Sequence, residues 1–353
     1  MVHHQRRLSI MLCTVMFGLT SACALPAMPA VSPPAATGTT PDGRSPVAAG
    51  PPAKIVLAQT APSPSGWPMY VAIARGFYTE EGVELEKLDL PSSTTQTQAL
   101  LAGDIHINSY TVDSVARAVL GGAPLKLVAS AQEIPDLQLI VSADINTATD
   151  LRGRTLGVGS PGGYFDTALK AMLQIQGVEP SEYQILAVRD VRARIPALQS
   201  GQIAATLMSS PDDLIALKEG LRSLGFLYQV IPGLQYNGYA VADQWAKANE
   251  TTLVHFLRGT LKGLAWLRDP ANKGEAQRIF LQAAGMPVDA TEIANLLYDR
   301  MVVQQMLGTD MRPNLSGTEK MLTLAVQLGS LPSVPPLDTW IDLHYLDQAS
   351  RLQ

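Results

Sequence analysis

Residues 54–90 read KIVLAQTAPSPSGWPMYVAIARGFYTEEGVELEKLDL. The run at 54–59 is apolar and rich in strand-forming residues, and the apolar positions of 67–76 fit one face of a helix. Gly76 is placed to end that helix, and 83–90 has the character of a second strand. The stretch therefore predicts a strand, a helix and a strand with short connections, which is the repeating unit of a parallel α/β sheet.

The same alternation continues along the chain. Further elements are predicted at 95–103 (helix), 105–110 (strand), 111–122 (helix) and 124–131 (strand). A second series begins near Asp150, with elements at 154–160 (strand), 164–177 (helix) and 183–188 (strand). The segments 99–107 and 197–205 are partly similar in sequence, which is compatible with equivalent structural units in two lobes and equally with chance. Because a chain of 353 residues is longer than a single hydrophobic core usually accommodates, we expect an α/β fold with two lobes.

Helices are predicted to dominate the C-terminal part of the chain. Residues 238–245 read as a strand and 250–269 as a long helix that ends before Pro270. Asp289 with Glu292, and Ser316 with Glu319, have the spacing of capping boxes that begin two more helices. Ser210 precedes Pro211 and Asp213, and we expect Ser210 to cap a helix as well.

The N-terminus has the layout of a secretory signal. Arg6 and Arg7 precede an apolar run at 8–19, which is too short for a confident membrane span. Thr20-Ser21-Ala22-Cys23 resembles a bacterial lipobox, so we expect a signal peptide at 1–22 and a lipidated Cys23. The alternative is that Cys23 is an ordinary residue near the cleavage site of a soluble signal. Either way the protein is expected outside the cytoplasm, in the periplasm or at the outer face of the cell membrane, and in the first case lipid-anchored.

Residues 23–53 follow as a Pro/Ala-rich segment with almost no large apolar side chain, and we predict a disordered tether. Removal of 1–22 deletes two arginines and no acid, so the formal charge changes from −5 to −7. An acidic chain without basic runs is a poor nucleic-acid binder, and nucleic acid is not an expected partner. Only Cys23 of the two cysteines would remain, which leaves no disulfide to form.

Motifs of catalysis and metal binding are not found in the sequence. The histidines of the folded part, His106, His255 and His344, lack metal-ligand spacing, and His106 on its strand is expected to be packed or hydrogen-bonded. Gly-Val-Gly-Ser-Pro-Gly-Gly at 157–163 is not a dinucleotide-binding turn in register. We therefore expect no cofactor, no metal and no enzymatic activity.

Candidate ligand contacts lie in loops after predicted strands, where open α/β sheets bind ligands. They are Ser65, Gly66, Trp67, Ser109, Tyr110, Thr111, Ser160, Gly162, Gly163, Tyr164, Ser209, Ser210 and Tyr236. Ser160 to Gly163 could hold an anionic oxygen at a helix start, or could be a plain capping turn. The tyrosines could enclose a planar ligand or belong to the core. Arg189, Arg192 and Arg194 could face an anion, but a solvated helix face is the expected role.

Three stretches carry a resemblance to a known family: GWPMYVAIARGFYTEEGVELE, AGDIHINSYTVDSVARAVLGGAPLKLVASA and DLRGRTLGVGSPGGYFDTALKAMLQIQGV. They resemble solute-binding proteins for nitrate, alkanesulfonates, taurine and thiamine-pyrimidine precursors, from about Lys54 to at least Asn237. The resemblance implies the periplasmic-binding-protein type II fold, with a ligand cleft between two lobes. It places 54–142 and 235–353 in lobe one and 143–234 in lobe two. One departure is Gly201-Gln-Ile-Ala-Ala, where such receptors often carry an acid.

The function that the resemblance implies is the extracytoplasmic binding component of an ABC importer. It would capture a small polar or anionic organic solute by lobe closure and pass it to a permease and an ATPase, as a monomer. One alternative is a lipoprotein that senses a ligand for a membrane receptor. Another is an enzyme similar to the pyrimidine-precursor synthases of this fold, which spend a histidine and use a cysteine-rich segment that this chain lacks.

Overall fold

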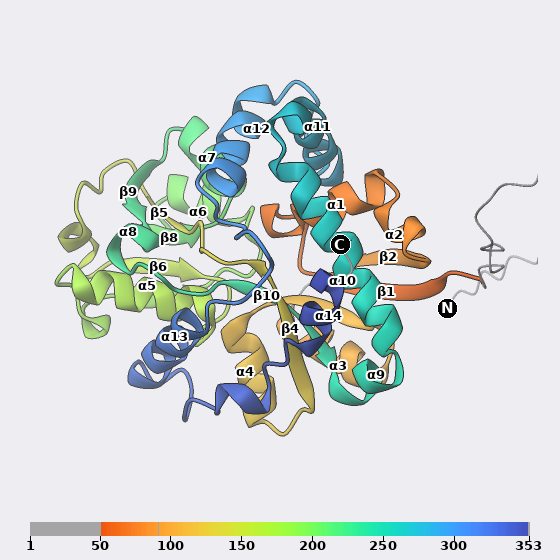
Figure 1. The fold of residues 1–353 in the computed structure, drawn as a ribbon. Coiled ribbons are helices and arrows are strands. Elements are labelled where there is room, and N and C mark those ends of the chain that lie inside the picture. Colours follow the sequence, from red (N-terminus) through yellow and green to blue (C-terminus); the bar gives the residue numbers. More distant parts are fainter. Residues whose placement is uncertain (1–50, 91, 352–353) are drawn as a thin grey trace, which may run out of the picture. The chain divides into compact units, whose positions relative to one another are not determined.

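The computed structural model describes residues 51–90 and 92–351, so the expected signal peptide, Cys23 and nearly all of the expected tether lie outside the described residues. The described residues fall in one compact unit. This unit contains two five-stranded sheets with helices packed around each (Figure 1). In the described part of the chain, no helix combines the length and the apolar character that a membrane span requires.

The first sheet has the strand order β2-β1-β3-β10-β4. Its strands are β1 (Ala53–Gln59), β2 (Val83–Asp89), β3 (Ile107–Thr111), β4 (Leu125–Gln132) and β10 (Asn237–Ala242). β1 pairs in parallel with β2 and β3, whereas β10 runs antiparallel to β3 and β4. Residues 243–245, expected to continue the last strand, instead begin helix α9. We call this sheet and the helices around it the first lobe.

The second sheet has the order β7-β6-β8-β5-β9 and is the basis of the second lobe. Its strands are β5 (Gln138–Val141), β6 (Thr155–Val158), β7 (Gln184–Ala187), β8 (Ala205–Met208) and β9 (Arg222–Phe226). β6, β7 and β8 are parallel, and β5 is antiparallel to β8 and β9. The two-sheet α/β architecture agrees with the fold expected from the alternating sequence pattern.

The helices of the first lobe include both short and long elements. They are α1 (Trp67–Ala74), α2 (Phe77–Glu80), α3 (Ser93–Ala102), α4 (Val112–Leu120), α9 (Asp243–Ala248), α10 (Glu250–Arg268), α11 (Lys273–Ala283), α12 (Thr291–Tyr298), α13 (Leu315–Gln327) and α14 (His344–Arg351). The second lobe holds α5 (Tyr164–Ile175), α6 (Arg194–Gln199), α7 (Asp212–Lys218) and α8 (Leu227–Val230). Short 3₁₀ turns occur at η1 (Pro64–Gly66), η2 (Ala148–Leu151), η3 (Pro180–Glu182), η4 (Pro270–Asn272) and η6 (Leu337–Thr339).

The segment η5 (Asp299–Val303) is a π-helical turn that directly continues α12. Helix α13 contacts both α4 of the first lobe and α5 of the second. Helix α10 packs so closely on α1 that a Cβ at Gly263 would lie 2.1 Å from the Pro68 carbonyl oxygen. The long C-terminal helices therefore complete the core of the first lobe and also reach its border with the second.

Three expected helix caps are replaced by other arrangements. Helix α13 begins at Leu315, and the side chain of Asn314, not Ser316, accepts a hydrogen bond from the Gly317 N–H at 2.9 Å. Helix α12 has no side-chain cap, so the expected role of Asp289 is wrong. Helix α7 begins at Asp212, and the Ser210 hydroxyl accepts from Arg300 instead of capping the helix. The sequence spacing identifies helix starts to within a few residues but misassigns the capping atoms.

Two crossovers join the sheets: residues 133–137 lead from β4 to β5, and residues 231–236 lead from α8 to β10. The Tyr236 N–H donates to the Glu133 carbonyl at 2.9 Å, so the crossovers are hydrogen-bonded to each other. β5 pairs in the second sheet, so the chain enters that sheet at Gln138, within the segment 54–142 that the family resemblance assigns to lobe one. The strand pattern alone does not show this, because β5 is a fully buried apolar run that fits either sheet.

Candidate ligand-binding site between the lobes

Both crossovers lie at the carboxyl ends of the parallel strands. The first joins the end of β4 to the start of β5, and the second leads into the start of β10. In the first lobe this edge holds the ends of β1, β3 and β4 and the start of the antiparallel β10. In the second it holds the ends of β6, β7 and β8 and the start of the antiparallel β5. Ligands of open α/β sheets bind at this edge, so the two edges that meet at the crossovers form the candidate site.

Polar side chains are buried along these two edges. They include Gln59, Asp113, Gln132, Asp136, Gln138, Ser210, Asp213 and Gln235. Burial of a polar group is unfavourable unless the group is hydrogen-bonded. So many buried polar groups on one border between lobes indicate either a structural network or a binding site. The hydrogen-bond partners of each group show which of the two roles it has.

Gln235 of the second crossover has a structural role. Its amide nitrogen donates to Ser130 Oγ at 3.0 Å and to the carbonyl oxygens of Gln132 and Asn237, both at 3.1 Å. Its amide oxygen accepts from the Asn314 N–H at 2.8 Å. The side chain thus joins the second crossover to the end of β4 and to the start of α13.

Asp136 of the first crossover is also fully engaged. One carboxylate oxygen accepts from the amide of Gln132 at 2.9 Å, and the other accepts from the Ser210 N–H at 3.0 Å. The second bond crosses from the crossover to the loop after β8. Asp136 therefore fixes the position of this loop, which carries two of the residues expected to contact ligand.

Tyr236 lies at the centre of a group that draws residues from both lobes. The Tyr164 ring packs edge-on against it, with ring centroids 5.3 Å apart, and Phe165 lies at 6.4 Å. Burial raises the pKa of Tyr236, and the nearby Asp136 and Asp113 carboxylates raise it further, whereas the Ser209 hydroxyl and Arg194 oppose the rise. We call this group the Tyr236 cluster. Its members are Asp113, Asp136, Tyr164, Phe165, Arg194, Ser209 and Tyr236.

Arg194 is buried, so the expected solvated role does not hold for it, although Arg189 and Arg192 are exposed. Its guanidinium donates to the carbonyl oxygens of Val188 at 3.0 Å and Leu207 at 3.3 Å, at the ends of β7 and β8. Burial lowers the pKa of Arg194, and the nearby Asp212 opposes this. A Cβ at Gly159 would lie 2.7 Å from an Arg194 nitrogen, so the glycine leaves room for the guanidinium.

An ion pair between the lobes closes one side of this border. Arg300 of η5 donates to the Asp213 carboxylate at 2.5 Å and to the Ser210 hydroxyl at 2.7 Å. The side chain of Asp213 is fully buried and that of Arg300 nearly so. Leu214 belongs to the same apolar cluster as Tyr298 and Met301 of the first lobe. In Figure 1, α7 lies next to α12 at this border.

The residues expected to contact ligand are only partly brought together. Tyr164, Ser209 and Tyr236 belong to the Tyr236 cluster, and Ser210 bridges Asp136 and Arg300. Thr111 lies at the start of α4, and its hydroxyl is 2.9 Å from that of Ser114. Ser109 is half-buried in β3, opposite Tyr239. These residues therefore lie at or near the carboxyl edges of the two sheets.

Other candidates are occupied by contacts within the protein. The Trp67 indole is fully buried against Phe280 and Tyr298 and donates to the Ala276 carbonyl at 2.9 Å, so it belongs to the core. The Tyr110 hydroxyl donates to the Ser93 carbonyl. Ser65 and Gly66 are buried in η1, and a Cβ at Gly66 would lie 2.6 Å from the Tyr70 ring. Gly66 is therefore explained by packing.

The turn at Ser160 to Gly163 combines exposed and engaged groups. Ser160 is exposed, and the Gly163 N–H donates to the Ser160 carbonyl at 3.0 Å. The Gly162 N–H donates to the buried Asp166 carboxylate at 2.6 Å, and the Gly162 carbonyl accepts from Arg117 of α4 at 2.5 Å. An anion at this helix start would therefore meet a carboxylate of the chain itself, which favours the plain capping turn over an anion site.

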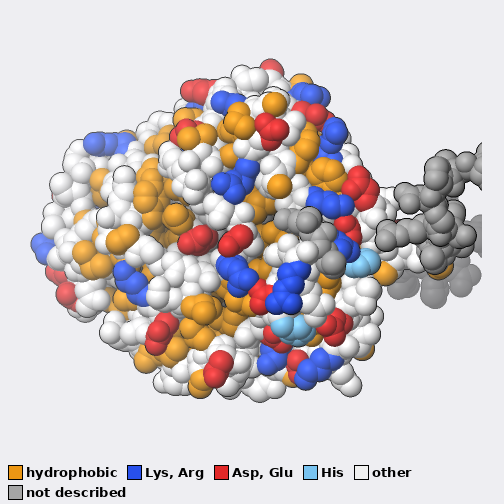
Figure 2. Space-filling model, in the orientation of Figure 1, with side chains coloured by type: hydrophobic (Ala, Val, Ile, Leu, Met, Phe, Trp, Pro, Cys, Tyr) orange, Lys and Arg blue, Asp and Glu red, His pale blue; other side chains and the backbone are white. Residues whose placement is uncertain are grey.

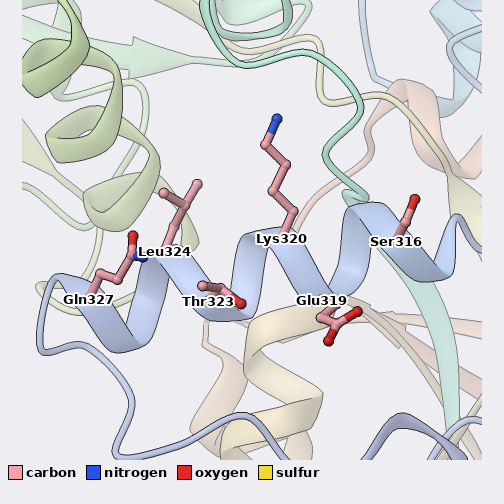
Figure 3. Close-up of a pocket in the computed structure, with 6 residues that line it drawn as sticks. All are labelled: Ser316, Glu319, Lys320, Thr323, Leu324 and Gln327. Atoms are coloured by element: carbon pink, nitrogen blue, oxygen red, sulfur yellow. The ribbon is translucent and has the colours of Figure 1, made fainter.

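Two surface hollows lie elsewhere. One lies along α13 (Figure 3), where Lys320 and Glu319 point in opposite directions and Leu324 is half-buried. The other, near Arg154 and Gly201, lies at the amino ends of β6 and β8. Neither hollow is at the carboxyl edge. On the face shown in Figure 2, acidic and basic side chains are interspersed.

The remaining expectations concern metals and histidines. Within residues 51–90 and 92–351, no group of three His, Cys, Asp or Glu side chains is placed to hold a metal ion. The His106 ring stacks on Trp245 at 5.2 Å and accepts from the Val56 N–H at 3.0 Å, which confirms its expected packed and hydrogen-bonded role.

The family described as NMT1/THI5 like matches residues 63–273, more than half of the chain. The chain belongs to this family. The riboflavin-binding protein RibY of Chloroflexus aurantiacus is 24% identical over 300 residues, with 82% of this chain and 80% of RibY covered. A formylaminopyrimidine-binding protein of Halalkalibacterium halodurans is 24% identical over 220 residues, with 60% of this chain and 65% of the relative covered.

Solved structures share the fold at lower sequence identity. The periplasmic nitrate-binding protein NrtA of Synechocystis PCC 6803 superposes with a TM-score of 0.70 at 15% identity, over 86% of this chain and 89% of NrtA. The desulfurization enzyme DszB superposes with a TM-score of 0.61 at 15% identity, over 85% of this chain and all of DszB. The fold is thus the periplasmic-binding-protein type II fold, as the sequence resemblance implies, and it occurs both in a binding protein and in an enzyme.

Proposed function

We propose that this NMT1/THI5-like protein is the extracytoplasmic solute-binding component of an ABC importer, a monomer that passes its ligand to a permease and an ATPase. The observation that carries the proposal is the convergence of both carboxyl edges and both crossovers on the Tyr236 cluster. A ligand held there would contact both lobes at once and would therefore favour the closed arrangement.

The proposed ligand is a small planar nitrogen heterocycle. The two curated relatives bind riboflavin and formylaminopyrimidine by name, and both of those ligands contain flat, nitrogen-rich rings. Tyr164, Phe165 and Tyr236 place three aromatic rings together at the border between the lobes. Aromatic side chains pack favourably on flat rings, and they prefer stacked or edge-to-face arrangements, which makes the contact specific in geometry.

Ligand binding is tested by thermal unfolding of the mature protein with riboflavin, formylaminopyrimidine, nitrate and ethanesulfonate. At a hundredfold excess over Kd, a ligand of the native state stabilises it by about 2.7 kcal/mol, which raises the Tm of a folded part of this size by roughly 4 °C. The ligand should be recovered chemically unchanged after prolonged incubation. If no compound raises the Tm, the proposed ligand class fails, and conversion of a bound compound would favour the enzymatic alternative that the DszB fold raises.

We further propose that Cys23 is lipidated and holds the protein at the outer face of the cell membrane. The support is the sequence alone, through the short apolar run and the small residues before Cys23. Mass spectrometry of the membrane fraction should find a mature N-terminus at an acylated Cys23, and Cys23→Ser should move the protein to the soluble fraction. An unmodified mature N-terminus at another residue would contradict the anchor without affecting the proposed ligand binding.

A further inference from the structure

Asp113, in the first turn of α4, carries a carboxylate oxygen that the fold leaves without a partner. The residue is only 1% exposed, and Oδ1 is buried with no hydrogen-bond partner among the described residues. The other oxygen lies 3.9 Å from the Arg117 guanidinium, beyond hydrogen-bond distance. A buried group left unpaired costs about 1–3 kcal/mol, and more when it is charged. Such a group calls for an explanation.

The position of Asp113 points to a ligand. It is close enough to Tyr164 and Tyr236 to raise the pKa of both hydroxyls, although burial contributes more. The Val112 N–H, one residue before Asp113, donates to the Tyr236 carbonyl at 3.0 Å, so the start of α4 in the first lobe lies against the Tyr236 cluster. Burial also raises the pKa of Asp113 itself, against the opposing effects of the Thr111 hydroxyl and Arg117.

The other charged groups at this border are held by short hydrogen bonds or ion pairs, although Oδ1 of Asp213 is, like Oδ1 of Asp113, buried without a partner among the described residues. Asp136 accepts two hydrogen bonds, and Asp213 is paired with Arg300. Arg194 donates to two backbone carbonyls. The cations are therefore engaged, while an acceptor oxygen on Asp113 is free. This is the reverse of what an anion such as nitrate or a sulfonate requires, because an anion needs unengaged donors.

We propose that Asp113 is a specificity-determining residue of the site: its Oδ1 accepts a hydrogen bond from an N–H group of the ligand and excludes anions that lack such a donor. The inference rests on the proposed function and deepens it, because it sets the charge and the hydrogen-bond polarity of the ligand. Charge-assisted hydrogen bonds are about twice as strong as neutral ones, so this single contact strongly separates the two classes of ligand.

The test is calorimetric titration of the mature protein with four probes: riboflavin and formylaminopyrimidine, which carry N–H groups, and nitrate and ethanesulfonate, which do not. We expect an N–H probe to bind the wild type and the two anions to bind at least a hundredfold more weakly. Asp113→Asn should weaken the N–H probe about tenfold, and Asp113→Leu, which removes the acceptor at similar size, should weaken it further. Neither variant should lower the Tm without ligand, because each removes an unpaired buried charge.

Asp243→Asn is the matched control. Asp243 begins α9 and pairs with Lys247 on the first lobe, away from the crossovers, so the affinity should not change. If an N–H probe binds and Asp113→Asn and Asp113→Leu leave its affinity unchanged, the role of Asp113 is wrong while the proposed function stands. Preferential binding of nitrate or ethanesulfonate also overturns the role of Asp113. If none of the four probes binds, the proposed ligand class fails, and the inference fails with it.

Discussion

Asp213 is a buried carboxylate whose ionisation is opposed by burial and favoured by Arg300. Burial is the larger effect, and it raises the pKa of Asp213 from 3.8 to about 6 in the folded protein. Between these two values the folded state binds more protons than the unfolded state at this position. The contribution of Asp213 to the free energy of unfolding therefore falls as the pH rises from about 4 to about 6, and it is constant above that range.

Asparagine cannot titrate, so Asp213→Asn lacks this pH dependence. We expect urea titrations to show that the free energy of unfolding of the wild type, relative to that of the variant, decreases from pH 4 to pH 6. The difference isolates Asp213 because the other carboxyl groups are present in both proteins. An increase over the same range would mean that the pairing with Arg300 outweighs burial.

Single residues of the site were less predictable than the helices and strands. Tyr164 begins a helix, Ser209 follows a strand and Tyr236 precedes one, so the sequence could place them at the edge of a sheet. Asp113 looks in sequence like an ordinary acid in the first turn of a helix, where the helix dipole stabilises a carboxylate. The absence of a hydrogen-bond partner for its Oδ1 within the described part of the chain is evident only in the three-dimensional structure.

The sequence predictions succeed for elements that are strongly apolar. The strands at β1, β3, β4 and β6 follow their expected positions closely because they are short, mostly buried runs, and the long helix α10 does so because it has one buried face. The helix caps do not: α12 has no side-chain cap, and at α13 both Ser and Asn could take the same role. Asn314 prevails at α13, where its N–H also binds Gln235.

Elements distant in sequence form the border between the lobes, and this limits prediction. Arg300 lies in a π-helical turn after α12, and it meets Ser210 and Asp213 across 90 and 87 residues of sequence. A lone arginine in a helical segment usually forms a solvated face, and nothing near Arg300 in the sequence distinguishes it. The same limit applies to Arg194, the one buried member of a group of three arginines.

At the scale of the whole molecule, the Arg300–Asp213 ion pair bears on the equilibrium between closed and open lobes. The pair and the Ser210 bond join η5 of the first lobe to the start of α7 in the second. Hydrogen bonds to charged groups contribute about 1.5–3 kcal/mol each when buried. Loss of the contact should therefore shift the ratio of closed to open molecules at least tenfold towards the open form.

Arg300→Gln tests this expectation by small-angle scattering at pH 7.5, where Asp213 is ionised because its pKa is about 6. The radius of gyration of the unliganded variant should exceed that of the wild type, and a saturating ligand should bring the two values together, because ligand contacts in both lobes favour closure. Arg278→Gln, an exposed position on α11, is the matched control and should leave the scattering unchanged. Equal radii for the variant and the wild type, with and without ligand, would show that the ion pair does not restrain the lobes and that closure depends on the crossovers alone.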